Sequence, residues 1–178
     1  MILLTTPRLR CETLREADWP FFLSLYQDRA VMRQVMDALS EAEIREAFDT
    51  RLTPWAPDAV HWLCLVVRDA NTHNPLGLTG FIQREKTMAE VGFLFSPAVQ
   101  GKGYGTESLR AVCDHAFSEG NFRRLTATVT AGNLASRRVL EKVGFVLEGE
   151  LRESYWLGGK WHNDWLMWLL RREYFPSP

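Results

Sequence analysis

The sequence predicts a mixed α/β (α+β) fold, in which helices flank a central sheet and a single domain spans residues 1–178. Two observations support this prediction. Strand-like and helix-like segments follow one another along the whole chain, and no linker or repeat separates them. The 178 residues, of which 46% are hydrophobic, are also enough for one domain with a substantial core.

The N-terminal third is expected to hold one strand and two helices. Residues 8–14 alternate between apolar and polar types, which is typical of a strand. Asp18 is placed to cap a helix that begins directly after it. Ser40 and Glu43 form a capping box, which predicts a second helix, and that helix should stop before Pro54.

The rest of the chain is expected to contribute six more strands and two more helices. Apolar, β-branched and aromatic residues dominate the strand candidates, and turn-forming residues separate them. In chain order these elements are three strands (60–67, 76–84 and 88–95), a helix from Thr106, a strand (125–130), a helix from Asn133 to Gly144, and a hairpin of two strands (145–157 and 161–170).

The most informative segment is the glycine-rich stretch 100–106, which lies between a predicted strand and a predicted helix. Its glycines let the backbone turn tightly and approach a ligand closely. The helix carries one apolar stripe, so the loop delivers its N–H groups at a helix N-terminus, where an anion is favoured. The stretch matches neither the P-loop pattern nor the dinucleotide fingerprint GxGxxG. We therefore expect a phosphate-binding loop, with Lys102 as a nearby positive charge, more than an ordinary strand-to-helix turn.

Gln100, Gly103 and Gly105 match the signature Gln/Arg-x-x-Gly-x-Gly/Ala, and the loop resembles the coenzyme A loop of the GNAT acyltransferase superfamily. The resemblance covers nearly all of the chain, because the order of predicted elements is similar to that of the GNAT fold. It implies a mixed central sheet of seven strands with a splayed fourth and fifth strand, flanked by four helices. Segments 6–9 and 159–164 resemble the branch that contains the ribosomal-protein N-terminal (alanine/serine) acetyltransferases, which also acetylates many small amines.

The resemblance implies that acetyl-CoA is the cosubstrate and that its pantetheine arm enters the gap between the splayed strands, as an added strand would. The glycine-rich loop would then hold the pyrophosphate. Asn133 would reach the pantetheine, although a helix cap is an equally good role for it. The implied cofactor-binding residues are Phe93, Leu94, Phe95, Gln100, Gly101, Lys102, Gly103, Tyr104, Gly105, Thr106, Asn133 and Ser136.

Glu90 is the preferred catalytic base, because superfamily members with a catalytic strand carboxylate have it at the matching position. An amine acceptor is mostly protonated at neutral pH and must lose a proton before it attacks. The alternative for Glu90 is a solvated or ion-paired carboxylate. Many superfamily members also use a tyrosine to protonate the departing thiolate, at the position where this chain has Leu140.

Two side chains are candidates to replace that tyrosine as the proton donor. Ser136 is preferred, since relatives in the ribosomal-protein branch have a serine near this position. Its alternative role is a local backbone hydrogen bond in the first turn of a helix. Tyr155 is the second candidate, and it stands where some of those relatives have a catalytic glutamate.

The expected function is acetyl-CoA-dependent N-acetylation of a primary amine, on a protein N-terminus or a small molecule, by direct attack in a ternary complex. The alternative is a non-catalytic acyl-CoA-binding module that acts as a sensor or interaction domain. Four of the seven tryptophans lie in the predicted C-terminal hairpin, where they should stabilise the hairpin or, if exposed, favour a homodimer. The alternative is that these hairpin tryptophans form an aromatic acceptor pocket, to which Trp19, Trp55 or Trp62 from the N-terminal half could also contribute.

Composition argues against several other classes of function. The net charge of −1 provides no general attraction to nucleic acid. The three cysteines have no CxxC spacing and the four histidines form no cluster, so no metal is expected. No apolar run is long enough for a signal peptide or a membrane span, so the chain is expected to be cytoplasmic, with no membrane partner.

Overall fold

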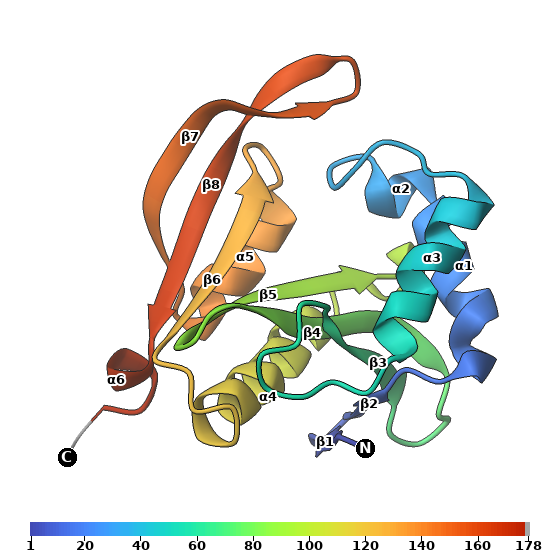
Figure 1. Cartoon of the computed structure of the whole chain (residues 1–178), viewed down its shortest axis with the longest axis horizontal. Helices are drawn as coiled ribbons and strands as arrows, with labels where there is room; N and C mark the ends of the chain where they lie inside the picture. The colour runs from blue at the N-terminus through green and yellow to red at the C-terminus, as the bar shows by residue number, and fades with distance from the viewer. Residues whose placement is uncertain (177–178) are drawn as a thin grey trace.

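The computed structural model describes residues 1–176, and within them the backbone forms one sheet of eight strands in the order β1-β2-β3-β4-β5-β6-β8-β7 (Figure 1). β5 and β6 run parallel to each other, while every other neighbouring pair is antiparallel, so the sheet is mixed. The strands are β1 Leu3–Thr5, β2 Leu9–Thr13, β3 Leu63–Asp69, β4 Pro75–Glu85, β5 Met88–Phe95, β6 Arg124–Thr130, β7 Val146–Leu157 and β8 Lys160–Leu170.

Six α-helices accompany the sheet in the described residues: α1 Trp19–Gln27, α2 Arg29–Met32, α3 Glu41–Leu52, α4 Tyr104–Ser118, α5 Leu134–Val143 and α6 Arg171–Tyr174. The predicted mixed fold is confirmed, but the numbers of seven strands and four helices are too low. The structure adds β1, α2 and α6, each of only three or four residues. Such segments are too short to display a hydrophobic period. Residues 177–178 of the predicted domain lie outside the described residues.

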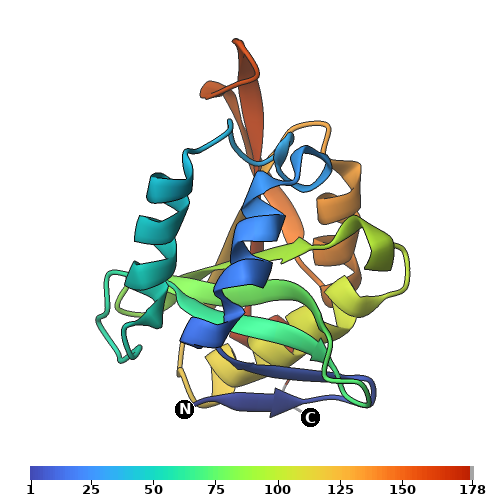
Figure 2. The same cartoon turned by 90° about the vertical axis from the view of Figure 1, so that its right-hand side faces the viewer.

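The sheet separates two hydrophobic clusters. In β3, Leu63, Leu65 and Val67 belong to the cluster that includes α4, whereas Cys64 and Val66 belong to the cluster that includes α1 and α3. Successive residues of a strand point to opposite faces of its sheet. Thus α1 and α3 cover one face, and α4 lies against the opposite face (Figure 2).

The helix starts at α3 and α5 follow the predicted capping residues. The Ser40 hydroxyl accepts a hydrogen bond from the Glu43 N–H at 3.1 Å, and the Glu43 carboxylate accepts one from the Ser40 N–H at 3.3 Å. The capping box is therefore confirmed. At α5, Asn133 Oδ1 accepts a hydrogen bond from the Ser136 N–H at 3.3 Å, and Gly144 ends the helix with a φ of 117°.

The predicted capping role of the Asp18 side chain is wrong. Asp18 does precede α1, but its side chain makes no capping hydrogen bond to that helix. The carboxylate is only 5% exposed and is bound by the buried Arg68 guanidinium and by the backbone N–H of Arg15. A buried carboxylate next to a buried guanidinium is held by that ion pair, so it is not available to the helix.

The parallel pairing of β5 with β6 is short. It covers only Met88 with Arg124, Ala89 with Leu125 and Glu90 with Thr126. Beyond Glu90, β5 continues to Phe95 paired only with β4, and β6 continues paired with β8. Figure 1 shows the two strands diverging from that point, which is the predicted splay.

Candidate active site

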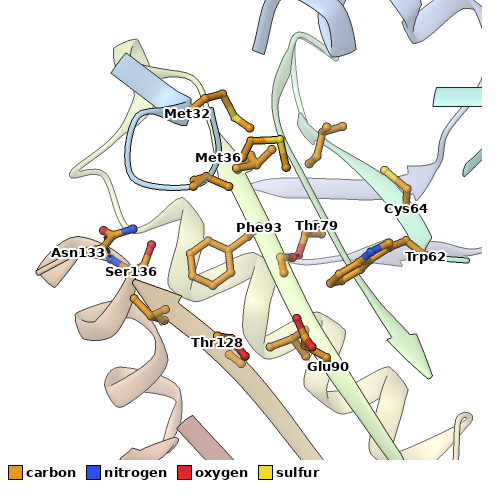
Figure 3. Close-up of a pocket in the computed structure, with 18 of the residues that line it drawn as sticks. Met32, Met36, Trp62, Cys64, Thr79, Glu90, Phe93, Thr128, Asn133 and Ser136 are labelled. Carbon is orange, nitrogen blue, oxygen red and sulfur yellow. Dashed lines mark hydrogen bonds between the residues drawn. The ribbon is translucent and has the colours of Figure 1, made fainter. Parts of the chain in front are cut away.

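The gap between the diverging strands contains a cavity of about 310 Å³. Its walls come from β3, β4, β5, β6 and the start of α5, and from the end of α2 with the segment after it, which contributes Met32, Gln34, Val35 and Met36. Figure 3 shows that side chains from these separate segments point into one space. The fold therefore places a concave, mostly apolar site where the sheet opens, as is common for small-molecule sites.

One side of the cavity carries the polar groups of α5. Asn133 and Ser136 lie together there, and the ring of Phe93 extends from β5 toward them (Figure 3). Leu94 and Leu140 also line the cavity, and Leu140 is fully buried. Residue 140, where many members of the resembled superfamily have a tyrosine, thus faces this space with an aliphatic side chain, which carries no proton donor.

The other side is aromatic and rich in sulfur. Trp62 and Cys64 lie across Phe93 from the α5 residues, and Met32 and Met36 lie above them in Figure 3. Burial raises the pKa of the Cys64 thiol to about 12, although the positive charge of Arg51 acts in the opposite direction. Cys64 is therefore a neutral apolar wall group at ordinary pH.

Glu90 stands where the two strands part. It forms the last residue pair between β5 and β6, and its carboxylate lines the cavity (Figure 3). The side chain is 22% exposed, and the Nε of Arg84 lies 3.1 Å from its Oε1. Glu90 is therefore ion-paired, as the alternative to a catalytic base predicted. The ion pair orients a carboxylate that also faces the site.

The indole of Trp62 packs against the backbone of β5 at Gly92. A Cβ added at Gly92 would lie 3.1 Å from two carbons of the Trp62 ring, which is closer than ordinary packing allows. The glycine thus leaves room for the aromatic wall. Among the N-terminal tryptophans predicted as possible members of an acceptor pocket, Trp62 lines the cavity, while Trp19 packs on Phe22 and Phe48 in the helical cluster.

The glycine-rich loop joins β5 to α4 and has the backbone shape that its glycines permit. Gly103 is the N-cap of α4 with a φ of 81°, and Gly101 has a φ of 78°. Both lie in the left-handed region that favours glycine. No side chain caps α4, so its first N–H groups are free to receive an anion.

Arg8 and Glu107 brace this loop from outside the cavity. The Arg8 Nε lies 2.7 Å from a Glu107 carboxylate oxygen, and its Nη1 donates to the carbonyl of Lys102 at 2.9 Å. The Thr6 hydroxyl and the Arg8 N–H also donate to Glu107. Partial burial works against the charged form, but these hydrogen bonds outweigh it and lower the pKa of Glu107.

Gln100 and Phe95 support the loop without lining the cavity. The Gln100 side-chain amide donates to the Phe95 carbonyl at 3.2 Å, and the Phe95 ring is 9% exposed. A Cβ at Gly105 would lie 3.8 Å from that ring and 3.4 Å from Val139 of α5. The predicted cofactor residues therefore fall into two groups: Phe93, Leu94, Asn133 and Ser136 in the cavity, and Phe95 with residues 100–106 beside it.

Tyr155 is not among the residues that line the cavity. Its hydroxyl donates a hydrogen bond to the Val35 carbonyl at 2.7 Å, and the N–H of Gly158 donates to Asp37 at 2.9 Å. Desolvation, followed by the nearby charges of Asp37 and Asp164, raises the pKa of Tyr155. In this structure it anchors the connection between α2 and α3 to the hairpin of β7 and β8.

Sequence reasoning missed the contributions of Met32, Val35, Met36 and Arg51 to the cavity. The segment 33–40 has no regular hydrophobic period, and nothing local to it indicates which side chains turn inward. Arg51 lies near the end of α3, the helix predicted from the capping box, but a charged residue on such a helix is usually solvated.

The fold and the cavity together define an acyltransferase with the GNAT architecture. Residues 8–146 match the family model described as acetyltransferase (GNAT) domain. The chain belongs to this family and is an enzyme of the acyltransferase class.

Several known proteins are similar along almost the whole chain. The uncharacterized N-acetyltransferase YnaD of Bacillus subtilis is 27% identical over 175 residues, which are 96% of this chain and 98% of that protein. A Vibrio cholerae spermidine N-acetyltransferase, solved with CoA and spermine, has a TM-score of 0.84 at 24% identity and covers 96% and 99% of the two chains. RimL, a ribosomal L7/L12 alpha-N-protein acetyltransferase solved with coenzyme A, has a TM-score of 0.80 at 20% identity over 95% and 98%. The putative ribosomal N-acetyltransferase YdaF of Bacillus subtilis is 34% identical over 86 residues, which are 48% of this chain and 47% of that protein, and this confirms the predicted resemblance to the ribosomal-protein branch.

Two further findings concern other kinds of site. Within residues 1–176, no group of three or more His, Cys, Asp or Glu side chains is arranged to hold a metal ion. In the same part of the chain, no helix is long and apolar enough to cross a membrane.

Proposed function

We propose that this chain is an acetyl-CoA-dependent N-acetyltransferase that transfers the acetyl group to a primary amine in a ternary complex. The observation that carries the proposal is the cavity at the splay of β5 and β6. The Glu90 carboxylate, the Ser136 hydroxyl and an unpaired stretch of strand meet there, next to a loop suited to a pyrophosphate.

Two regions of the protein would bind two different parts of acetyl-CoA. The first N–H groups of α4, with Lys102 nearby, suit the negatively charged pyrophosphate. Val91 to Phe95 have no strand partner on the β6 side, so their backbone groups are available to the amides of pantetheine. Asn133 keeps its side-chain N–H₂ group for the same arm while its oxygen caps α5.

Glu90 is the proposed base. It receives a proton from the amine, directly or through one water, as the amine nitrogen attacks the thioester carbonyl carbon. A backbone N–H of β5 stabilises the negative charge that develops on the carbonyl oxygen. The acetyl–sulfur bond then breaks, and the acetyl group remains on nitrogen.

Ser136 is the proposed donor of the proton that the departing thiolate accepts. It lines the cavity beside Asn133, in the first turn of α5 (Figure 3). Its position favours it over Tyr155, whose hydroxyl is engaged with Val35. Leu140 carries no hydroxyl, so Ser136 is the hydroxyl that α5 contributes to this wall.

The alternative is a module that binds acyl-CoA without turnover. Thiol release from acetyl-CoA over a panel of peptides, amino acids, polyamines and aromatic amines separates the two, with CoA binding measured by calorimetry. We expect binding together with thiol release on at least one amine, and slower release in a Ser136→Ala variant that binds CoA normally. Binding without release on any amine would establish the module instead.

We also propose that the chain forms a homodimer through the hairpin of β7 and β8. β7 is an edge strand, and Val146, Leu151, Trp156 and Trp161 on this hairpin are each about half exposed. An exposed apolar edge is a typical site for a two-fold interface between identical chains.

The cytoplasmic location stays a prediction.

A further inference from the structure

The acceptor side of the cavity has a composition that limits which amine can occupy it. This step rests on the proposed function. Besides the charged Glu90 and Arg51 and the polar Gln34 and Thr79, this side is lined by apolar or aromatic side chains: Tyr26, Met32, Val35, Met36, Trp62 and Leu78. Such a wall favours an acceptor with an apolar or aromatic body.

Within residues 1–176, two charged side chains line the cavity, Glu90 and Arg51. Glu90 already has a cationic partner in Arg84, at 3.1 Å. A polyamine would bring two or more positive charges into a space that offers one paired carboxylate and one additional guanidinium. Like charges in a partly desolvated site repel, so this cavity disfavours a polycation.

Arg51 lies near the end of α3, and its charge is not balanced by the protein. Its Nη1 donates to the Ala47 carbonyl at 3.1 Å, and its guanidinium carbon lies 5.9 Å from the centre of the Phe22 ring. Among residues 1–176, no carboxylate comes within 4.0 Å of this guanidinium. Four of its five N–H donors remain for another partner.

We infer that the acceptor is an amine that carries a carboxylate and an apolar or aromatic body, with the carboxylate bound by Arg51 and the amine directed to Glu90. A planar guanidinium pairs with a carboxylate through two parallel hydrogen bonds, which fixes the orientation of the ligand as well as its position. The two charged groups of the cavity then each meet an opposite charge. A polyamine such as spermidine would lack the group that Arg51 requires.

The test uses pairs of amines that share a body and differ only in the carboxylate: phenylalanine with phenethylamine, and 4-(aminomethyl)benzoate with benzylamine, together with spermidine. We expect kcat/KM from thiol release to be at least ~10-fold higher for the acid in at least one pair, and lowest for spermidine. In Arg51→Gln this preference should disappear, because the KM for the acid rises while its kcat changes little. Arg51→Lys should keep part of the preference. Arg45→Gln removes the same charge from the same helix outside the cavity and should leave the preference intact.

Failure of the inference differs from failure of the proposed function. Turnover of spermidine or of the decarboxylated amines as fast as the acids, or an unchanged preference in Arg51→Gln, would overturn the inference while the enzyme remains active. If no amine releases thiol, the proposed function fails. In that case, calorimetry measures the binding of the same amine pairs to the CoA-loaded protein. Tighter binding of the acid than of its decarboxylated partner would support the inference, and equal binding would overturn it.

Discussion

Among single residues, Glu90 is the one on which the proposed catalysis depends most, because Arg84 binds it on one side and it faces the cavity on the other. Glu90→Gln keeps the shape of the side chain and removes its ability to accept a proton. We expect kcat to fall roughly 100-fold or more, the usual contribution of general base catalysis, with CoA affinity unchanged. Steady-state thiol release and CoA calorimetry measure the two quantities.

Glu85→Gln is the matched control for this substitution. It removes the same charge from the exposed end of β4, outside the cavity, and should leave kcat unchanged. Full activity in Glu90→Gln would remove Glu90 as the base and leave a water chain in its place.

The three cysteines provide a second prediction at this scale. Cys11, Cys64 and Cys113 are buried, and burial raises the pKa of Cys11 and of Cys64 to about 12 and that of Cys113 further. A raised pKa keeps a thiol protonated at pH 8, and only the thiolate reacts rapidly. A chromogenic disulfide reagent should therefore find no fast thiol in the native protein and three after unfolding in guanidinium. One thiol that reacts in seconds in the native protein would contradict this.

The sequence predicts those site residues that belong to a short local pattern, and it misses those that reach the site through tertiary packing. Asn133 and Ser136 belong to a helix start, and the glycines of 101–105 belong to one turn, so short patterns reveal them. Arg51 and Met36 reach the cavity only because α3 and the segment before it fold over β3 and β4. No local pattern encodes that approach, because it is set by tertiary packing.

At the scale of elements, the start of α4 is held by Glu107 and its bonds to Thr6 and Arg8. Glu107→Gln weakens these charge-assisted hydrogen bonds, and we expect a loss of about 1–3 kcal/mol in the free energy of unfolding at pH 7. We also expect weaker CoA binding, because the loop loses its brace. Urea unfolding and calorimetry check the two effects, and Glu119→Gln at the exposed end of α4 is the control.

The pH dependence of this effect has a defined sign. The pKa of Glu107 is lower in the folded chain than in the unfolded one, so its stabilising effect is present above the unfolded value near ~4.3. The effect is lost as the pH falls through the folded value. The stability difference between wild type and Glu107→Gln should therefore be constant near neutrality and vanish in acid. A difference that grows as the pH falls would contradict the assignment.

The elements themselves were predictable where they are long. The capping box at Ser40 and the amphipathic stripe of α4 specify their helices from sequence alone. β1, α2 and α6 were missed because segments of three or four residues depend on neighbours that the local sequence does not identify.

At the scale of the whole molecule, the exposed hairpin predicts self-association. A charge placed at Leu151 or Trp161, as in Leu151→Lys or Trp161→Lys, should convert a dimer into a monomer, since it would be desolvated in the interface. Sedimentation at micromolar concentration measures this. Val60→Lys, at an exposed apolar residue away from the hairpin, is the control. A wild-type chain that remains monomeric at all concentrations would refute the dimer.

The central claim is that the splay between β5 and β6, together with the loop before α4, receives acetyl-CoA. Hydrogen exchange of the backbone amides with and without CoA tests it most directly, because it locates the donor without knowledge of the acceptor. We predict slower exchange in residues 91–95 and 101–106 when CoA binds, and unchanged exchange in β7. CoA binding that leaves both segments unprotected and slows exchange elsewhere would contradict it.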